Sequence, residues 1–299
     1  MNNLINYSKF FKTAIICSFI AMIVSLFFIF FKGLNYGVDF NGGTLIEIRV
    51  SDKNIKIQQI REFFDGNKLG EVNVKQFGKE NDFLIKFEKN SEEIEKFIFE
   101  LKKDISKKIG SEVNFRRVES VGPKVSDDLL KQGIIAIVLS FAGIFFYLWI
   151  RFEWQFSLGS IIALIHDVII TLGIFSIMSL EVNLSIIAAV LTIIGYSIND
   201  TVVIYDRIRE NLLKYSKMNT NEIANISINE TFSRTIITSG TTLLAVVSIF
   251  VFGGEILRGF SFAMILGIII GTYSSIFIAS PALNYFKVTQ KTLLKEENI

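Results

Sequence analysis

Long apolar segments dominate the pattern of hydrophobic and polar positions along the chain. Five of them, 18 to 28 residues long, contain no charged residue, and a sixth is interrupted only by His166 and Asp167. An α-helix rises about 1.5 Å per residue, so about 20 residues cross the hydrocarbon core of a bilayer. The pattern therefore predicts six transmembrane helices, at residues 13–31, 132–150, 154–180, 182–199, 235–254 and 259–286.

The polar segment between the first two spans mixes period-2 and helical patterns. It predicts strands at 43–50, 71–77, 82–88 and 113–119 and helices at 54–66 and 91–110. The second helix has the clearest limits: Ser91 as N-cap, Glu92 and Glu93 in the first turn, and Gly110 as the stop. The order β-α-β-β-α-β is that of a ferredoxin-like unit. We therefore predict a membrane bundle of six helices with an inserted α+β ferredoxin-like domain.

These elements divide the chain into four parts. Residues 1–32 are predicted to form a short tail and the first span, and 33–131 the inserted extracytoplasmic domain. Residues 132–286 hold the other five spans, with a cytoplasmic loop at 205–235, and 287–299 form a tail. Within the loop, residues 220–235 suggest an amphipathic helix lying on the inner membrane surface.

Basic residues predict the orientation. If the N-terminus is cytoplasmic, the two short outer loops hold only Arg258. Eleven basic residues then lie on the cytoplasmic side, as the positive-inside rule requires. They are Lys9, Lys12, Arg151, Arg207, Arg209, Lys214, Lys217, Arg234, Lys287, Lys291 and Lys295. The first span is too long for a secretory signal peptide and lacks a cleavage site before Lys32, so we expect a retained anchor and two cytoplasmic termini.

Composition removes several classes of function. With one histidine and one cysteine the chain cannot build a conventional zinc site, a Cys–His nucleophile pair or an internal disulfide. It contains no phosphate-binding or dinucleotide-binding glycine motif and no HExxH. Residues 33–131 hold 18 basic and 18 acidic side chains, so no charge excess attracts nucleic acid. We predict no enzyme, no cofactor and no metal.

Ionisable groups inside the spans are the candidate functional residues, because each costs about 2.5–3.5 kcal/mol near the bilayer centre. Asp200 lies six residues before Asp206, which places it about 9 Å inside the cytoplasmic edge of the fourth span. Arg234 stands at the cytoplasmic end of the fifth span. We expect the two to form a proton-responsive ion pair; the alternatives are a fixed structural salt bridge or, for Arg234, a flanking residue of the positive-inside kind.

Three further polar residues lie within the spans. His166 and Asp167 are adjacent in the third span, and Asn199 precedes Asp200 in the fourth. They are candidates for a polar relay or an inter-helix lock; a buried histidine and a helix–helix hydrogen bond are the alternative. Asp206 and Arg207 open the cytoplasmic segment, where a solvated charge cluster is the simpler interpretation.

Several motifs resemble those of the SecD/SecF family, in order along nearly the whole chain. Residues 37–43 contain Asp39, Phe40, Gly42 and Gly43 in a VDFxGG pattern, and Gly122 and Pro123 form a VGP pattern. Residues 163–168 contain the His166–Asp167 pair, and residues 195–200 end at Asp200. Residues 203–209 contain Asp206 and Arg207, and residues 233–242 contain Arg234.

The resemblance implies an RND-like half that pairs with SecD to form a twelve-helix unit beside the SecYEG translocon in the bacterial inner membrane. Such a unit is expected to use the proton-motive force to draw exported polypeptides outward. The resemblance assigns proton movement to Asp200 and an important role to Arg234, and leaves the His166–Asp167 pair less defined.

Two other functions compete with this one. An RND-type exporter of small hydrophobic molecules would need a porter domain and usually two such halves in one chain. A passive structural subunit would use buried ions only to set helix register, and it should survive neutralisation of Asp200.

Overall fold

The computed structural model describes residues 5–52, 54–65, 69, 72–76, 80–87, 94–215 and 218–296. The chain divides into two compact units. One contains Met1–Asn35 and Ile135–Ile299, and the other contains Tyr36–Ile134.

Six helices in the described part of the chain are long and apolar enough to cross a membrane, which confirms the predicted number. A 3-10 turn, Tyr7–Phe10, precedes the first of them, and short strands, β1 (Asn35–Tyr36) and β6 (Glu181–Val182), flank two of their ends. The helices are α1 (Phe11–Phe31), α5 (Pro123–Arg151), α6 (Trp154–Ile177), α7 (Leu184–Lys214), α8 (Thr220–Phe252) and α9 (Glu255–Ser274), the last extended by α10 (Ser280–Tyr285) and followed by α11 (Gln290–Glu296).

Segment 205–235, expected to be a cytoplasmic loop, is almost entirely helical. α7 continues to Lys214, and α8 begins at Thr220 behind a capping box in which Asn219 and Glu222 bond each other's backbone N–H. No proline or glycine interrupts the chain between this cap and the fifth span, so one helix forms. Its first turns bury Ile223 and Ile228 in the same core as Tyr205 of α7 instead of lying on the membrane surface.

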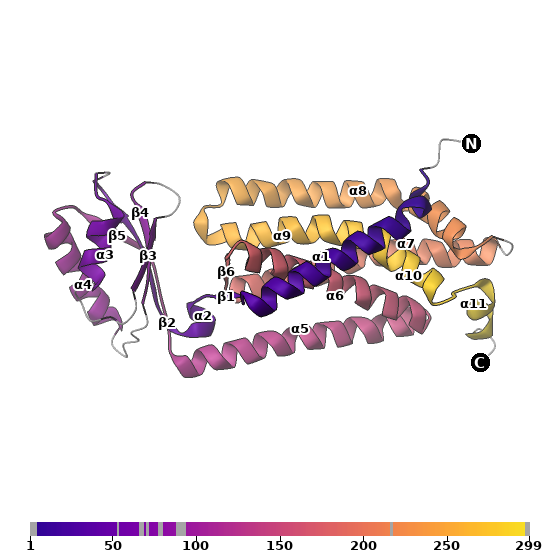
Figure 1. Ribbon diagram of the computed structural model, residues 1–299, viewed down its shortest axis with the longest axis horizontal. Helices are drawn as coiled ribbons and strands as arrows, with labels where there is room; N and C mark the ends of the chain where they lie inside the picture. Colours follow the sequence, from indigo (N-terminus) through magenta and orange to yellow (C-terminus); the bar gives the residue numbers. More distant parts are fainter. Residues whose placement is uncertain are drawn as a thin grey trace. The chain divides into compact units, whose positions relative to one another are not determined.

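α6, α7 and α9 form the centre of the bundle. Roughly half of the residues in their apolar windows are buried, against fewer than a fifth in α1, α5 and α8. α9 contacts α6, α7 and α8, and the N-terminal end of α1 lies at the same end of this unit as α11 (Figure 1). α7 and α9 pack closely. A Cβ added to Gly267 would lie 2.2 Å from the Ile193 side chain, and a Cβ added to Gly271 would lie 2.9 Å from the Ser197 side chain. Glycine therefore permits this contact.

A π-helical turn, Ser275–Ala279, joins α9 to α10. Pro281 explains it, because proline lacks the N–H that would bond the carbonyl of Phe277 and its ring crowds that carbonyl. Side chains take over the displaced carbonyls. Tyr205 Oη donates to the Ala279 oxygen at 2.8 Å, and Ser280 Oγ donates to the Ser275 oxygen at 2.9 Å.

The second unit has the predicted ferredoxin-like order. Its strands are β2 (Gly43–Val50), β3 (Val72–Gln76), β4 (Asp82–Phe87) and β5 (Val113–Val121), and its helices are α2 (Val38–Asn41), α3 (Ile57–Asp65) and α4 (Ile94–Ile109). The sheet order is β3-β4-β2-β5, and every neighbouring pair is antiparallel. Gly110 ends α4 at φ +68°, as expected of a helix stop. The predicted cap at Ser91, Glu92 and Glu93 lies outside the described residues.

Alternation along β2 separates an apolar face from a charged one. Ile46 and Ile48 lie in the core shared with α3 and α4, while Glu47 and Arg49 occupy the other face. Arg49 forms two hydrogen bonds of 2.6 Å with Asp82, its partner in the β2–β4 register. Glu47 is buried, and its nearest cation is Arg116 at 3.8 Å.

The two glycine-containing motifs meet at the base of this unit. Gly42 has φ +72°, a conformation that strains any L side chain, and its missing Cβ would lie 3.4 Å from the Val121 oxygen. Gly43 pairs with Val121 at the start of the β2–β5 ladder, and Ser126 Oγ donates to the Gly122 oxygen. The VDFxGG and VGP patterns therefore contact each other at the end of the sheet where the β2–β5 ladder begins.

Glu47 provides a test of this packing. Burial raises the pKa of the Glu47 carboxyl, and the nearby arginines offset this only in part. The folded unit therefore holds this proton more tightly than the unfolded chain does. The stability contributed by protonated Glu47 is complete below the pKa of a glutamate in the unfolded chain, about 4.3. It is lost as the pH rises through the higher pKa of Glu47 in the folded unit.

We predict that Glu47→Gln raises the melting temperature of the excised unit 36–134 at pH 7 by a few degrees. The gain should shrink as pH falls toward 4, measured by far-UV circular dichroism. Glu112→Gln, at an exposed position beside β5, should change little at either pH. A lower melting temperature for Glu47→Gln at pH 7 would show that the arginines outweigh the burial.

Candidate functional site

Asp200 lies inside the bundle between three helices. Its side chain is 2% exposed, and its Oδ2 accepts hydrogen bonds from Ser239 Oγ of α8 at 3.0 Å and Thr272 Oγ1 of α9 at 3.5 Å. The two hydroxyls are 2.8 Å apart. Asp200 is therefore not exposed on the outer surface of the bundle. Neighbouring helices of its own chain cover it.

The expected ion pair between Asp200 and Arg234 is absent; no cation of the described residues lies within 4.0 Å of the carboxylate. Arg234 is exposed on α8, five residues before Ser239. Five residues correspond to about 7.5 Å along a helix and about 140° around it. The guanidinium therefore starts from a different face of α8, nearer the N-terminal end of the helix, while Thr235 and Ser239 occupy the buried face.

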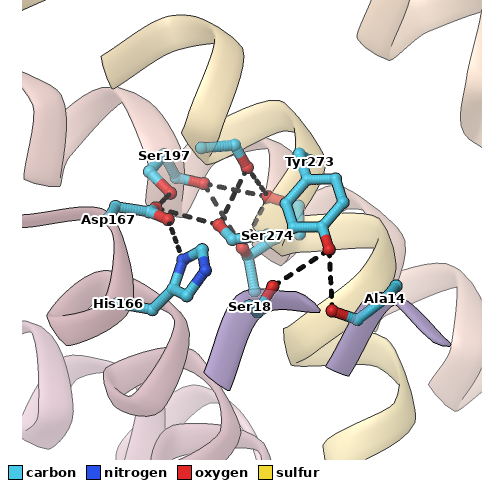
Figure 2. Close-up of polar contacts among 10 residues, drawn as sticks. Ala14, Ser18, His166, Asp167, Ser197, Tyr273 and Ser274 are labelled. Carbon is cyan, nitrogen blue, oxygen red and sulfur yellow. Dashed lines mark hydrogen bonds and ion pairs between the residues drawn. The ribbon is translucent and has the colours of Figure 1, made fainter. Parts of the chain in front are cut away.

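A second buried carboxylate, Asp167, joins α6, α7 and α9 (Figure 2). Its Oδ2 accepts hydrogen bonds from Ser197 Oγ at 2.6 Å and Ser274 Oγ at 2.9 Å, and its Oδ1 lies 2.9 Å from His166 Nδ1. Both His166 and Asp167 are at most 1% exposed. The adjacent pair thus bonds to itself as well as to two other helices, which fits the expected inter-helix lock.

His166 also lines a cavity of about 290 Å³ against α1. Its ring stacks on Tyr273 with centroids 6.2 Å apart, and its Nε2 is buried without a hydrogen-bond partner. Ser18 Oγ and Tyr273 Oη, 2.9 Å apart, lie on the other side of the ring (Figure 2). The remaining lining residues are Cys17, Ala21, Ile170, Ile269 and Ile270.

Asn199 takes no part in the hydrogen bonds of either carboxylate. Its side chain is exposed on α7, together with Ala188, Thr192 and Gly195, which recur at intervals of three or four residues. No atom lies within 4 Å of a Cβ built at Gly195. This face of α7 is therefore an uncovered strip of small residues, of the kind along which membrane helices associate.

The charges at the C-terminal end of α7 form the predicted cluster. Arg207 bonds Glu210 and Glu230 at 2.6 Å each, and Asp206 lies 3.3 Å from Arg151. These side chains are partly exposed. A separate contact is more deeply placed, because Arg209 lies 3.3 Å from Glu153, which is 4% exposed. The cluster ties α7 to α5, α6 and α8.

The hydroxyl partners of the carboxylates were not predicted. Thr272 and Ser274 lie in a segment whose only sequence signal was apolarity, and Ser239 lies in the motif at residues 233–242 but was not singled out. A weak signal existed on α8, where Thr231, Thr235 and Ser239 recur every four residues and so share one helix face.

Arrangement and composition together define a class: a polytopic membrane protein with buried, hydroxyl-bound carboxylates and one inserted ferredoxin-like unit. The chain matches the family described as "Protein export membrane protein SecD/SecF, C-terminal" over residues 101–289, and the "SecD/SecF GG Motif" over residues 27–53. It therefore belongs to the SecD/SecF family.

Individual relatives agree. The chain is 48% identical to protein translocase subunit SecF of Rickettsia bellii (strain OSU 85-389), covering 94% of this chain and 93% of that one. It is 46% identical to protein translocase subunit SecF of Rickettsia prowazekii (strain Madrid E), covering 94% and 90%.

Among solved structures, the crystal structure of SecDF, a translocon-associated membrane protein from Thermus thermophilus, superposes with a TM-score of 0.86 at 33% identity. The match covers 96% of this chain and 39% of that chain. SecDF in the super-membrane-facing form gives a TM-score of 0.70 at 32% identity over 100% of this chain and 40% of that one. The chain thus spans about two fifths of these SecDF chains.

The position of Arg234 leads to a prediction about protein level. Because Arg234 is exposed and pairs with no carboxylate within 4.0 Å, Arg234→Met should change the free energy of unfolding by no more than about 0.5 kcal/mol and leave the steady-state level unchanged. Arg209→Met is the matched control. This change leaves the buried Glu153 carboxylate without its cation, which costs about 3 kcal/mol of stability. The amount of Arg209→Met protein in an immunoblot of membranes should therefore fall. A lower level of the Arg234→Met protein would instead support the alternative that Arg234 and Asp200 form a fixed structural salt bridge.

Proposed function

We propose that this chain works with SecD to couple the proton-motive force to Sec-dependent protein translocation across the bacterial inner membrane. Family membership and the translocase names of the relatives support the role in Sec protein translocation. Those names describe subunits of a translocase and not enzymes, in keeping with a transport role without catalysis. Asp200 is the proton carrier in this proposal, and Arg234 modulates it.

The observation that carries the proposal is the neutral surrounding of Asp200. Its carboxylate is bound by two hydroxyls and by no cation within 4.0 Å, so a proton can bind without breaking an ion pair. An ionised carboxylate only accepts hydrogen bonds, whereas a protonated one also donates. Protonation therefore forces a hydroxyl of α8 or α9 to turn or withdraw. Contacts among three helices then depend on one proton.

The available energy matches this task. A proton moving inward down about 150 mV releases about 3.5 kcal/mol before any pH difference is added. A hydrogen bond to a charged group contributes about 1.5–3 kcal/mol. One proton can therefore offset the loss of one or two bonds to Asp200, which is enough to favour a second packing of α8 and α9 against α7.

Arg234 is placed to act at long range. It lies about 7.5 Å nearer the cytoplasmic end than Ser239 and is exposed. A cation there favours the ionised form of a nearby carboxylate and so promotes release of the proton to the cytoplasmic side. In this proposal it approaches Asp200 only after α8 has shifted.

The partners follow from the uncovered surfaces and the family. SecD is the expected partner helix bundle for the small-residue strip of α7, which includes Thr192, Gly195 and Asn199. SecYEG and exported polypeptides are the proposed wider assembly, since one structural relative is described as translocon-associated. Both termini are proposed to be cytoplasmic, and the ferredoxin-like unit extracytoplasmic.

We predict that Asp200→Asn stops proton-driven export while the protein and its complex with SecD remain at normal levels. Asparagine keeps the shape and the hydrogen bonds to Ser239 and Thr272 but cannot titrate. Export should be followed in inverted membrane vesicles with and without a proton-motive force. Asp128→Asn, the same change at an exposed carboxylate of α5, is the control and should export normally. Full export by Asp200→Asn would mean that the subunit is passive.

We predict that Gly195→Leu weakens association with SecD at least tenfold in co-purification from mild detergent. No atom lies within 4 Å of the added Cβ, so the chain itself should fold, while a bulky side chain would block a closely packed partner helix. Gly143→Leu on α5 places the same side chain at another open, exposed glycine and serves as the control. Equal recovery of SecD with both variants would exclude this strip as the interface.

A further inference from the structure

His166 and Asp167 form a dyad whose outer nitrogen is unused. Asp167 Oδ1 lies 2.9 Å from His166 Nδ1, and with the carboxylate as acceptor the hydrogen sits on Nδ1. Ser197 and Ser274 bond the other carboxylate oxygen and hold it in place. This arrangement fixes the orientation and tautomer of the imidazole and leaves Nε2 with a free lone pair.

The unpartnered Nε2 points to a missing ligand. An imidazole nitrogen buried without a hydrogen bond is costly, and such an atom in a folded protein calls for an unseen partner. His166 lines the pocket of about 290 Å³ beside α1, which is open on one side, is large enough for water and is lined mainly by apolar side chains, so water there depends on its few polar groups. Ser18 Oγ and Tyr273 Oη lie on its wall and can complete the hydrogen bonds of a water molecule there.

We propose that His166 and Asp167 form a second proton-binding site, in which water in the cavity beside α1 exchanges a proton with His166 Nε2. In this step an O–H bond of a hydrated proton breaks and an N–H bond forms at Nε2. The positive charge spreads over the imidazolium and is neutralised by the adjacent Asp167 carboxylate. Asp167 is a positioning residue, and the imidazole is the acceptor.

The geometry favours a proton over a metal cation at this site. Ser197 and Ser274 donate to Asp167 Oδ2 at 2.6 and 2.9 Å, distances that leave no room for a cation between the oxygens. An imidazole is also a poor ligand for alkali cations, which bind oxygen atoms. Among the described residues no group of three acidic, histidine or cysteine side chains could hold a metal.

The groups facing His166 can be named helix by helix. α6 contributes Asp167, α1 contributes Cys17, and α9 contributes Tyr273. α7 contributes the neutral hydroxyl of Ser197, and its own carboxylate, Asp200, bonds instead toward α8 and α9. The charge balance of the dyad therefore depends on its own two members.

This site is distinct from Asp200, and the inference rests on the proposed function in that it assumes a bundle driven by protons. The two carboxylates share helices but no hydrogen-bonded atom: Thr272 serves Asp200 and Ser274 serves Asp167. The protonation state of His166 tests the dyad, whereas export by the Asp200→Asn variant tests the proposed function. The second proton-binding site and the proposed function can therefore fail independently.

The single histidine of the chain makes a decisive measurement simple. The full chain, labelled with ¹⁵N-histidine and reconstituted with unlabelled SecD in liposomes, gives one pair of ring signals in solid-state NMR. We expect hydrogen on Nδ1 alone at high pH and a doubly protonated signal that grows as the pH is lowered. Asp167→Asn should cut that doubly protonated fraction at least threefold at a given pH, while Asp200→Asn should not. Hydrogen on Nε2 at high pH, or an unchanging spectrum, overturns the proposal.

The single cysteine tests whether water fills the cavity. Cys17 is on the cavity wall, so a charged methanethiosulfonate, which does not enter lipid, should modify it. The control is Ile16→Cys in a Cys17→Ser background, at the same depth on α1, exposed and outside the cavity. We expect at least tenfold faster modification of Cys17. If only an apolar maleimide reacts, or both positions react equally slowly, the cavity holds lipid and the proposal fails.

Discussion

Burying two carboxylates among apolar helices is the constraint on which this bundle depends. Each must find hydrogen-bond donors that water would otherwise supply, and the donors come from hydroxyls of neighbouring helices. α7 carries Asp200 and also Ser197, which serves Asp167. α9 carries Thr272 and Ser274, two residues apart and so on nearly opposite sides of the helix, one for each carboxylate. The contact between α7 and α9 therefore joins both sites.

The close approach of these helices follows from the same need. A serine hydroxyl reaches only a short distance, so helices that share such bonds must pack closely. Gly267 and Gly271 provide that on α9, where side chains would collide with Ile193 and Ser197. Gly195 on α7, in contrast, lies on an open face of this chain. Glycine in a membrane helix marks a close contact only when its direction around the helix is known.

That limit explains what the sequence could and could not predict. The number of spans and the ferredoxin-like order follow from apolar runs and periodicity, which are properties of residue type alone. The Asp200–Arg234 pair was inferred from depth, and depth without rotation about the helix axis does not show that the two side chains are more than 4.0 Å apart in this structure. The hydroxyl partners were hidden because most membrane serines and threonines bond their own helix, as Thr241 and Ser248 do with carbonyls four residues earlier. Only packing distinguishes Ser239 from these.

The helix that serves both carboxylates is also the one with an irregular backbone. α9 ends at Ser274, the Asp167 partner, and the π-helical turn begins at the next residue. In that turn Ser275 Oγ lies 2.9 Å from Thr201 Oγ1 of α7, and the Ala279 oxygen accepts from Tyr205, also of α7. Single π turns of this kind are rare and are frequent at functional sites. The π-helical turn and α10 both pack against α7, so the contact between α7 and α9 continues beyond the two carboxylates.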